Sequence, residues 1–266
     1  MKILTPGTYY GARRTELKQD GLILSEYDYL ARQTDWHYHE NPYFMYVLDG
    51  QLYDINQKQK THCHGGTFLF HNWQEQHFNS LHSAAARGFH LEFDREWAAR
   101  YLTDLSLWEG SRALDHPRLH RLICSIYFEF KANDSLSPVS LQLLLINLCE
   151  NIQETDSREA HAPGWIARLK ELLHDDPDQS LSLAALSRQL GVHPVHISRA
   201  VPKYLACTLG EYVRLMKVQK SLSYLLHSAC SLTEIAYMCG FADQSHFTRV
   251  FRKYYGCTPG QIRKCL

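Results

Sequence analysis

The 266-residue sequence has no apolar run close to the roughly 18 residues that a membrane-spanning helix requires. Residues 1–11 also lack the apolar core of a secretory signal peptide. The eight cysteines show no regular pairing, which in a chain of this length is typical of reduced thiols rather than of a disulfide framework. These absences predict a protein of a bacterial-type cytoplasm with no membrane partner.

The sequence also has no excess of charge of one sign, because 28 Lys and Arg residues balance 28 Asp and Glu residues. The balance hides an asymmetry. Residues 165–266 hold 13 Lys and Arg against 7 Asp and Glu, a net charge of +6, which leaves 15 against 21, or −6, for the rest. A basic part joined to an acidic part is expected of a DNA-binding domain attached to a sensor, since phosphate neutralisation dominates DNA affinity. On charge alone, the alternative is a solvated basic face with no partner.

Hydrophobic periodicity divides the chain into a strand-rich part and a helical part. Short β-type runs at 21–29, 43–48, 51–56, 66–70 and 88–93 are separated by Asp49-Gly50 and Gly65-Gly66, which is typical of an antiparallel barrel or jelly roll. Between residues 116 and 153 the period becomes helical, in two apolar stripes that predict either a dimerisation surface or packing onto the barrel. The polar stretch 156–164 is the predicted linker, and everything after it reads as helix.

The last hundred residues contain one pattern twice. Each copy is a helical stretch that ends in a glycine, Gly191 or Gly240, and the two glycines are 240 − 191 = 49 residues apart. A small residue, Ser187 or Ala236, lies four positions earlier and allows two helices to cross closely, while the glycine allows the positive φ of a sharp helix exit. The pattern predicts two helix-turn-helix units in tandem. The alternative is two unrelated helical hairpins.

The second helix of each unit carries the predicted DNA contacts. The first of these helices should begin near Pro194 and the second should be capped by Asp243, while 178–180 should cap the helix that starts near 183. Apolar residues spaced four apart face inward, which leaves the predicted contacts on the outer faces: Val195, His196, Ser198, Arg199, Lys203, Gln244, Ser245, Thr248, Arg249, Arg252 and Lys253.

The chemistry of these side chains separates base readers from phosphate contacts. Arginine donates to guanine through two hydrogen bonds and glutamine pairs in the same way with adenine, so Arg199, Gln244 and Arg249 are the predicted base readers. The cations one turn further along, Lys203, Arg252 and Lys253, are predicted to contact phosphates. For any single residue, a solvated charge is the alternative.

The second unit resembles the signature of AraC-type transcriptional regulators. The matching segments are Ile235-Ala236, Gly240-Phe241, Asp243-Gln244-Ser245-His246-Phe247, Arg249-Val250-Phe251-Arg252-Lys253 and Gly256-Cys257-Thr258-Pro259. The resemblance implies a seven-helix domain that places two recognition helices in successive major-groove segments of double-stranded DNA and activates transcription through RNA polymerase. The first unit departs from the pattern at Val201-Pro202, and a proline there predicts a kinked or short recognition helix.

The amino-terminal part resembles the two cupin motifs. Trp36-His37-Tyr38-His39 is followed by Gly50, and Gly66 is followed by His77. The position of the metal-binding glutamate falls at about Tyr43 or Phe44, and Asn72 and Gln74 replace the proline and glycine of the second motif. Three roles stay open for the histidines: His37, His39 and His77 bind a divalent metal, they line an effector pocket, or they have a hydrogen-bonded structural role. The predicted pocket residues are Trp36, His37, His39, Tyr43 and His77, and no cofactor is otherwise expected.

We therefore expect an α+β protein of two domains. Residues 1–110 form a cupin-like or jelly-roll-like antiparallel β-barrel, 111–160 a helical linker that dimerises or packs on it, and 161–266 an all-α double helix-turn-helix domain. The leading function is a sequence-specific transcriptional regulator, without catalytic residues, that responds to a small-molecule effector. The alternative is a metal-dependent cupin enzyme with an accessory DNA-binding domain, against which the missing glutamate and the lack of an acid–base pair argue. A third reading is a DNA-binding module with no effector.

Overall fold

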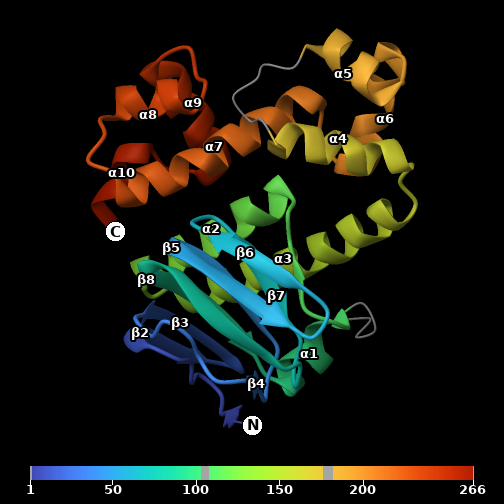
Figure 1. The fold of residues 1–266 in the computed structure, drawn as a ribbon. Coiled ribbons are helices and arrows are strands. Elements are labelled where there is room, and N and C mark those ends of the chain that lie inside the picture. Colours follow the sequence, from blue (N-terminus) through green and yellow to red (C-terminus); the bar gives the residue numbers. More distant parts are fainter. Residues whose placement is uncertain (1, 103–107, 176–181, 266) are drawn as a thin grey trace. The chain divides into compact units, whose positions relative to one another are not determined.

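The computed structural model describes residues 2–102, 108–175 and 182–265 (Figure 1). The chain forms two compact units, the first made of Met1–Asp115 with Leu122–Cys149 and the second of His116–Arg121 with Glu150–Leu266. The boundary between units falls inside α2 (Pro117–Ala132) and inside α3 (Ser137–Ala160). Residues 111–160 are thus shared between the units, and the predicted domain limits at 110 and 160 stay predictions.

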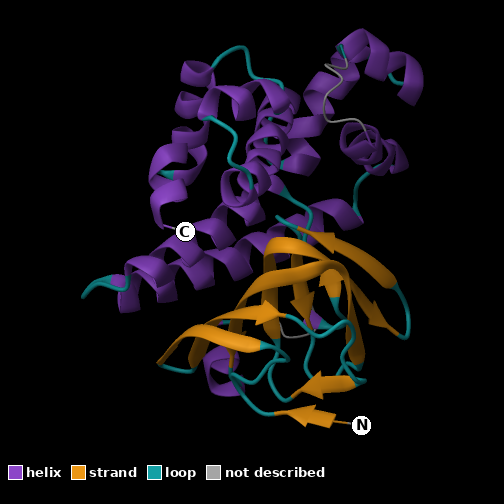
Figure 2. Cartoon of the chain, turned by 60° about the vertical axis from the view of Figure 1, so that its left-hand side comes forward, coloured by secondary structure: helices purple, strands orange, loops and turns teal. Residues whose placement is uncertain are grey.

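The first unit is built on a nine-stranded sheet that curls into a half-barrel (Figure 2). Its main path runs β1-β4-β8-β5-β7-β9, while β2 pairs with β3, β3 with β8, and β6 with β5. All pairs are antiparallel except the parallel pair β1 and β4. The strands are β1 (Lys2–Leu4), β2 (Ala12–Gln19), β3 (Leu22–Tyr29), β4 (His37–His39), β5 (Tyr43–Asn56), β6 (Lys60–His64), β7 (Phe68–His71), β8 (His77–Phe93) and β9 (Arg112–Ala113).

The predicted turn at Asp49-Gly50 is wrong, because β5 runs through it as one 14-residue strand. Its register against β8 shifts between Val47 and Asp49 and again between Gly50 and Leu52, as in a β-bulge. Gly50 has φ 77°, and a Cβ at this position would lie 2.3 Å from the carbonyl oxygen of Ala85. Glycine is therefore required here for a bulge inside a strand, a role that the sequence does not distinguish from a turn.

Buried residues lie on both faces of the first part of β5 and the last part of β8. Tyr43, Met45 and Val47 of β5 face the inside of the curl. On the other face, Phe89 packs against Tyr127 and Phe130 of α2, with ring centroids 5.1 and 5.3 Å apart. The α2 stripe thus packs onto the barrel, which was one of the two expectations for it. The short helix α1 (Arg95–Tyr101) covers the same face through Trp97, which lies 5.3 Å from Phe93.

The second unit is helical. Its helices are α4 (Gly164–Asp175), α5 (Leu183–Leu190), α6 (Pro194–Leu205), α7 (Leu209–His227), α8 (Leu232–Met238), α9 (Gln244–Tyr255) and α10 (Pro259–Cys265). These seven helices, which follow α3 in the described part of the chain, confirm the predicted double helix-turn-helix architecture. Among the described residues, no helix combines the length and the apolar character that a membrane span requires.

Two predicted helix boundaries differ from the structure. Ser182 caps α5 by accepting a hydrogen bond from the Ala185 amide at 3.2 Å, while residues 178–180, predicted as the cap, lie outside the described residues. The linker predicted at 156–164 is wrong in its first half, because α3 continues to Ala160. A polar sequence does not by itself end a helix, and here Arg158 donates to Glu154 one turn earlier at 2.6 Å.

Candidate nucleic-acid interface and buried histidine cluster

The first helix-turn-helix unit consists of α5 and α6, joined by a turn at Gly191. Gly191 ends α5 in the left-handed conformation with φ 65°, as predicted. Ile197 and Val201 of α6 are fully buried in a core shared with α4, α5 and α7. Their burial fixes which face of α6 points outward.

The predicted shortening of α6 at Pro202 is wrong. The helix has 12 residues and continues to Leu205, so it is as long as α9. Proline removes the amide that would bond the Ser198 carbonyl. Pro202 lies in the last turn, so only three helical residues follow it and little of the helix is affected.

The second helix-turn-helix unit consists of α8 and α9, joined by a turn at Gly240, which has φ 71°. The Lys217 ammonium of α7 donates to the Gly240 carbonyl at 2.7 Å and so ties the turn to the connecting helix. Asp243 caps α9, as predicted, by accepting from the His246 amide at 2.7 Å. Phe247 and Phe251 are fully buried and set the outer face of α9.

The residues predicted to contact DNA lie on these outer faces. Arg199 of α6 and Arg249 of α9 are both exposed. Among the rest, Thr248 is half-buried, and the exposed ones are Val195, His196, Ser198, Lys203, Gln244, Ser245, Arg252 and Lys253. Exposure is what DNA contact requires, and the individual contacts stay predictions.

The outer face of α9 borders a surface hollow lined by Gln244, Ser245, Thr248, Arg249, Arg252, Lys253 and Thr258. The lining contains three cations and no acidic residue. The Thr233 hydroxyl donates to the Gln244 amide oxygen at 2.6 Å, which holds that side chain at the start of the helix. Thr258, which sequence reasoning did not assign to the interface, lies in the loop before α10, and its place in the hollow is set by the tertiary fold alone.

The compact unit that holds the curled sheet contains a second candidate site, a cluster of buried histidines inside the curl. His37 of β4 is paired in register with His77 of β8, and their ring centroids are 4.3 Å apart. His39 is stacked on His77 at 5.6 Å, and the Tyr43 hydroxyl lies 3.2 Å from His77 Nε2. The structure thus brings together four of the five predicted pocket residues.

Trp36 does not join this cluster. Its side chain is 42% exposed and packs against Phe78, with ring centroids 4.8 Å apart. Trp36 lies in a bend directly before β4, outside the strand that carries His37 and His39.

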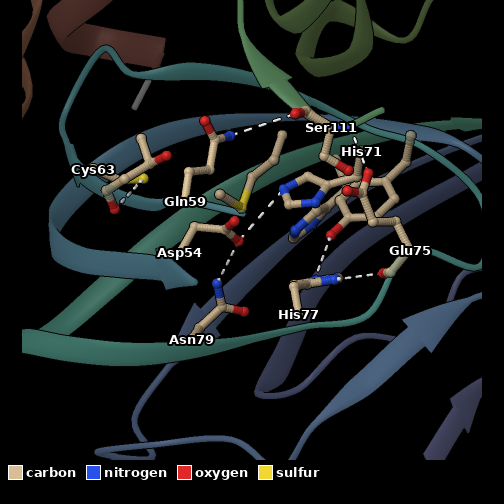
Figure 3. A network of polar contacts seen from close by, with 12 residues as sticks. Asp54, Gln59, Cys63, His71, Glu75, His77, Asn79 and Ser111 are labelled. Carbon is tan, nitrogen blue, oxygen red and sulfur yellow. Dashed lines mark hydrogen bonds and ion pairs between the residues drawn. The ribbon is translucent and has the colours of Figure 1, made fainter. Parts of the chain in front are cut away.

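Sequence reasoning missed the carboxylate of the cluster. Asp54 of β5 is 4% exposed, its Oδ2 accepts from Asn79 Nδ2 at 2.8 Å, and it lies 3.5 Å from His71 Nε2 (Figure 3). At the start of β5, every second residue beginning with Tyr43 faces inward. The bulge shifts this alternation by one residue, so that the even-numbered Asp54 faces inward. Alternation counted from the start of the strand would therefore have placed it outside.

His71 and His90 also line the cluster. His71 of β7 is stacked on Tyr43 at 4.6 Å, and the Tyr29 hydroxyl lies 2.5 Å from His90 Nε2. The sequence showed that this half of the chain is rich in histidine, but only the pairing of β7 and β8 with β5 shows which histidines turn inward.

Burial keeps these imidazoles neutral near pH 7. It lowers the pKa of His71 and that of His77 to about 3 and lowers the pKa of His39 well below its usual value. Burial also raises the pKa of the Asp54 carboxyl. The His77 Nδ1 lies 3.3 Å from the Glu75 carbonyl, and since a carbonyl only accepts, this nitrogen carries the proton. The Nε2 lone pair then accepts from the Tyr43 hydroxyl at 3.2 Å.

Two donor sets in the cluster have the composition of metal sites. His37, His39 and His77 form one, and Asp54, His71 and His77 form the other; within each set the donor atoms lie within 4.8 Å of one another. The first set is the one that the sequence motif predicts, although Tyr43 or Phe44 occupies the position of its carboxylate. The second set supplies its own carboxylate.

A small pocket adjoins the cluster. Its lining residues are Tyr10, Gly11, Tyr29, Leu30, Ala31, Thr34, Leu52, Asn79 and Leu81. Three of them touch the cluster, because the Tyr10 ring lies 4.9 Å from that of His37, Tyr29 reaches His90, and Asn79 donates to Asp54. None of the five predicted pocket residues is among the residues that line this pocket.

Comparison with known proteins gives the following similarities. A family model described as a helix-turn-helix domain matches residues 186–264. The "HTH-type transcriptional activator RhaS" of Escherichia fergusonii is 30% identical over 118 residues, which cover 44% of this chain and 40% of RhaS. The "Probable transcription factor PqrA" of Proteus vulgaris is 31% identical over 87 residues, which cover 33% of this chain and 71% of PqrA. The chain thus matches about two fifths of the length of that RhaS.

A solved structure of ToxT from Vibrio cholerae is similar over 93% of this chain and 99% of ToxT, with 12% identity and a TM-score of 0.39.

Proposed function

Because this chain belongs to the AraC family of transcriptional regulators, we propose that it activates transcription by binding double-stranded DNA through α6 and α9. The observation that carries the proposal is the pair of recognition helices, each held by a buried apolar face and each presenting arginine outward. Base-edge contacts then come from Arg199, Gln244 and Arg249, and phosphate contacts come from Lys203, Arg252 and Lys253.

The length of α7 supports simultaneous contact by both units. Its 19 residues correspond to roughly 28 Å of helix at 1.5 Å per residue. Major-groove segments on one face of B-DNA recur at about 34 Å. A connecting helix of this length is therefore compatible with contact of α6 and α9 to two successive segments.

Selection of bound fragments from a random DNA pool, followed by salt titration on the selected site, tests the proposal. Three phosphate contacts from Lys203, Arg252 and Lys253 predict a slope of log affinity against log salt of at least about −2.7, since each contact contributes roughly 0.9. Substituting the three residues by alanine should remove that part of the slope. The matched control is Arg168→Ala, because this arginine is exposed but lies on α4 and pairs with Glu171 at 2.8 Å. A chain that selects no sequence would contradict the proposal.

We also propose a homodimer formed through the start of α3. Leu136, Val139 and Leu143 are 71%, 64% and 63% exposed, and the last two lie one helical turn apart on the same face. Exposed apolar stripes of this kind mark protein contacts. Sedimentation should give a dimer for the natural chain and a monomer for Leu143→Glu, while a monomeric natural chain would contradict this assignment.

The remaining parts of the proposal are a small-molecule effector in the compact unit that holds the curled sheet, RNA polymerase as partner and a cytoplasmic location. A ligand that binds the folded state alone raises the melting temperature, so a thermal-shift screen of sugars and metabolites tests the effector. Absence of catalytic activity stays a prediction. It is tested by an activity screen of the metal-loaded protein.

A further inference from the structure

We propose that Asp54, His71 and His77 bind a divalent first-row transition-metal ion, for which Zn²⁺ is the probe. The three residues come from β5, β7 and β8 and point toward one another inside the curl (Figure 3). The site differs from the one that the sequence motif predicts, because it shares only His77 with that set.

The first argument is the geometry of the donor atoms. His71 Nε2 and Asp54 Oδ2 are 3.5 Å apart and form no hydrogen bond. Two ligands of a tetrahedral zinc ion, each about 2.0–2.1 Å from the metal, are separated by about 3.3 Å. The observed distance is thus long for a hydrogen bond but close to that expected for two ligands of one ion.

The second argument is the unsatisfied polar atoms. His71 is 2% exposed, and neither of its ring nitrogens has a hydrogen-bond partner among the described residues. A buried polar group without a partner costs free energy, and such groups in a folded protein call for an explanation. A bound ion would satisfy one of the two nitrogens.

The third argument is charge. Asp54 is a buried carboxylate whose ion-pair partner among the described residues is His71, a neutral imidazole at pH 7. A divalent cation would compensate this carboxylate directly. In the set of His37, His39 and His77 all three protein ligands are neutral, whereas the set that contains Asp54 supplies a negative charge of its own.

The surroundings of the ligands match those of a metal site. Metal-binding histidines usually donate their second ring nitrogen to a carbonyl, and ligating carboxylates accept hydrogen bonds. Here His77 Nδ1 donates to the Glu75 carbonyl at 3.3 Å, and Asn79 donates to Asp54 at 2.8 Å. Asn79 also lines the small pocket that adjoins the cluster.

The test uses the full chain, stripped with a chelator and then titrated with Zn²⁺ or Co²⁺. We expect one ion per chain by elemental analysis, a raised melting temperature, and visible absorption bands of protein-bound Co²⁺. His71→Gln and Asp54→Asn should each lower the affinity by at least about 100-fold, beyond the loss usual for residues that only orient ligands. His39→Gln should change it by less than about 10-fold, and the exposed His62→Gln should not change it.

Two results would overturn the proposal. One is a natural chain that retains no stoichiometric metal. The other is a folded His71→Gln protein, as judged by circular dichroism, that binds the ion normally while His39→Gln does not, since the ion would then lie in the other set. Binding of the same variants to the selected DNA is measured separately, in buffer that contains the chelator and therefore no bound metal. Loss of DNA binding contradicts the proposed function, whereas loss of metal binding alone contradicts only the metal site.

Discussion

The two helix-turn-helix units share a backbone plan but differ in what they present and in how they are held. Both recognition helices have 12 residues, and both follow a glycine with positive φ. The predicted contacts on α6 include two cations, Arg199 and Lys203. Those on α9 include three, Arg249, Arg252 and Lys253, gathered around one hollow. From this difference we predict that the second helix-turn-helix unit makes the larger contribution to DNA affinity.

The cores of the two units differ in the same direction. In the first, α6 is anchored by the aliphatic residues Ile197 and Val201. In the second, Phe247 lies 5.1 Å from Phe241 and 5.6 Å from Phe251, so that α9 is anchored by aromatic rings. Aromatic side chains bury more area per residue, and each aromatic pair contributes a further ~0.5–1.5 kcal/mol to stability. The unit with more cations on its surface also has the more strongly packed helix.

The largest expected effect comes from removing these anchors. Phe247→Ala should destabilise the second unit by about 3–5 kcal/mol and Ile197→Ala the first by about 2–5 kcal/mol, because each leaves a cavity in a fully buried site. Hydrogen exchange resolved by peptide measures both effects, since faster exchange should be confined to the unit that carries the substitution. The exposed Val195→Ala is the control. Equal acceleration in both units would show that they unfold together and that the comparison does not hold.

The next effect concerns base reading. Arg249→Ala and Arg199→Ala should each cost about 1–3 kcal/mol on the selected DNA site, or roughly 5- to 150-fold in affinity, with the larger loss for Arg249. Affinity for random DNA should fall much less. Fluorescence anisotropy on both DNAs measures this, with Arg168→Ala as the control.

Equal losses on selected and random DNA would show that Arg249 contacts only phosphate. A larger loss for Arg199 would reverse the ranking of the two units.

The repeat itself is where sequence reasoning was most successful. α6 begins at Pro194 and Asp243 caps α9, both as predicted. These features are local, because periodicity, caps and glycines act within a few residues of their own position. The prediction for Pro202 was wrong since the cost of a helix proline depends on how much helix follows it, and here little does.

The histidine cluster was predicted only in part. His37, His39 and His77 follow from the spacing of the motif. Asp54 and His71 do not, because their orientation depends on a bulge in β5 and on which strands pair with it. Register over distant strands is a tertiary property that one sequence does not carry in its local pattern.

A smaller effect compares the two turns. Gly191→Ala and Gly240→Ala should each cost about 1–2 kcal/mol, because both glycines adopt a left-handed backbone. A Cβ at Gly191 meets open space, whereas one at Gly240 would lie 3.0 Å from Lys217 Nζ. The loss at Gly240 should be the larger, since that lysine must also give up its bond to the turn. Denaturant midpoints measure the difference, and Lys217→Met is the companion variant that removes the bond alone. A greater loss at Gly191 would contradict this account.

The smallest expected effect lies at the caps of the recognition helices. Asp243 accepts from the His246 amide at 2.7 Å, while His193 at the start of α6 accepts from the Val195 amide at 3.3 Å. A charged acceptor at short range stabilises a helix start more than a neutral one at long range, through both the hydrogen bond and the helix dipole. Asp243→Ala should therefore cost about 1 kcal/mol and His193→Ala less.

Asp243→Asn separates the two contributions of the α9 cap, because asparagine keeps the accepting oxygen and loses the charge. If the hydrogen bond dominates, exchange of the His246 amide in Asp243→Asn should stay close to that of the natural chain, while Asp243→Ala accelerates it. If both variants accelerate it equally, the helix dipole dominates. Equal effects of His193→Ala and Asp243→Ala on their own helices would show that the two recognition helices start with the same stability, and the difference between the units would then lie in their cores and cations alone.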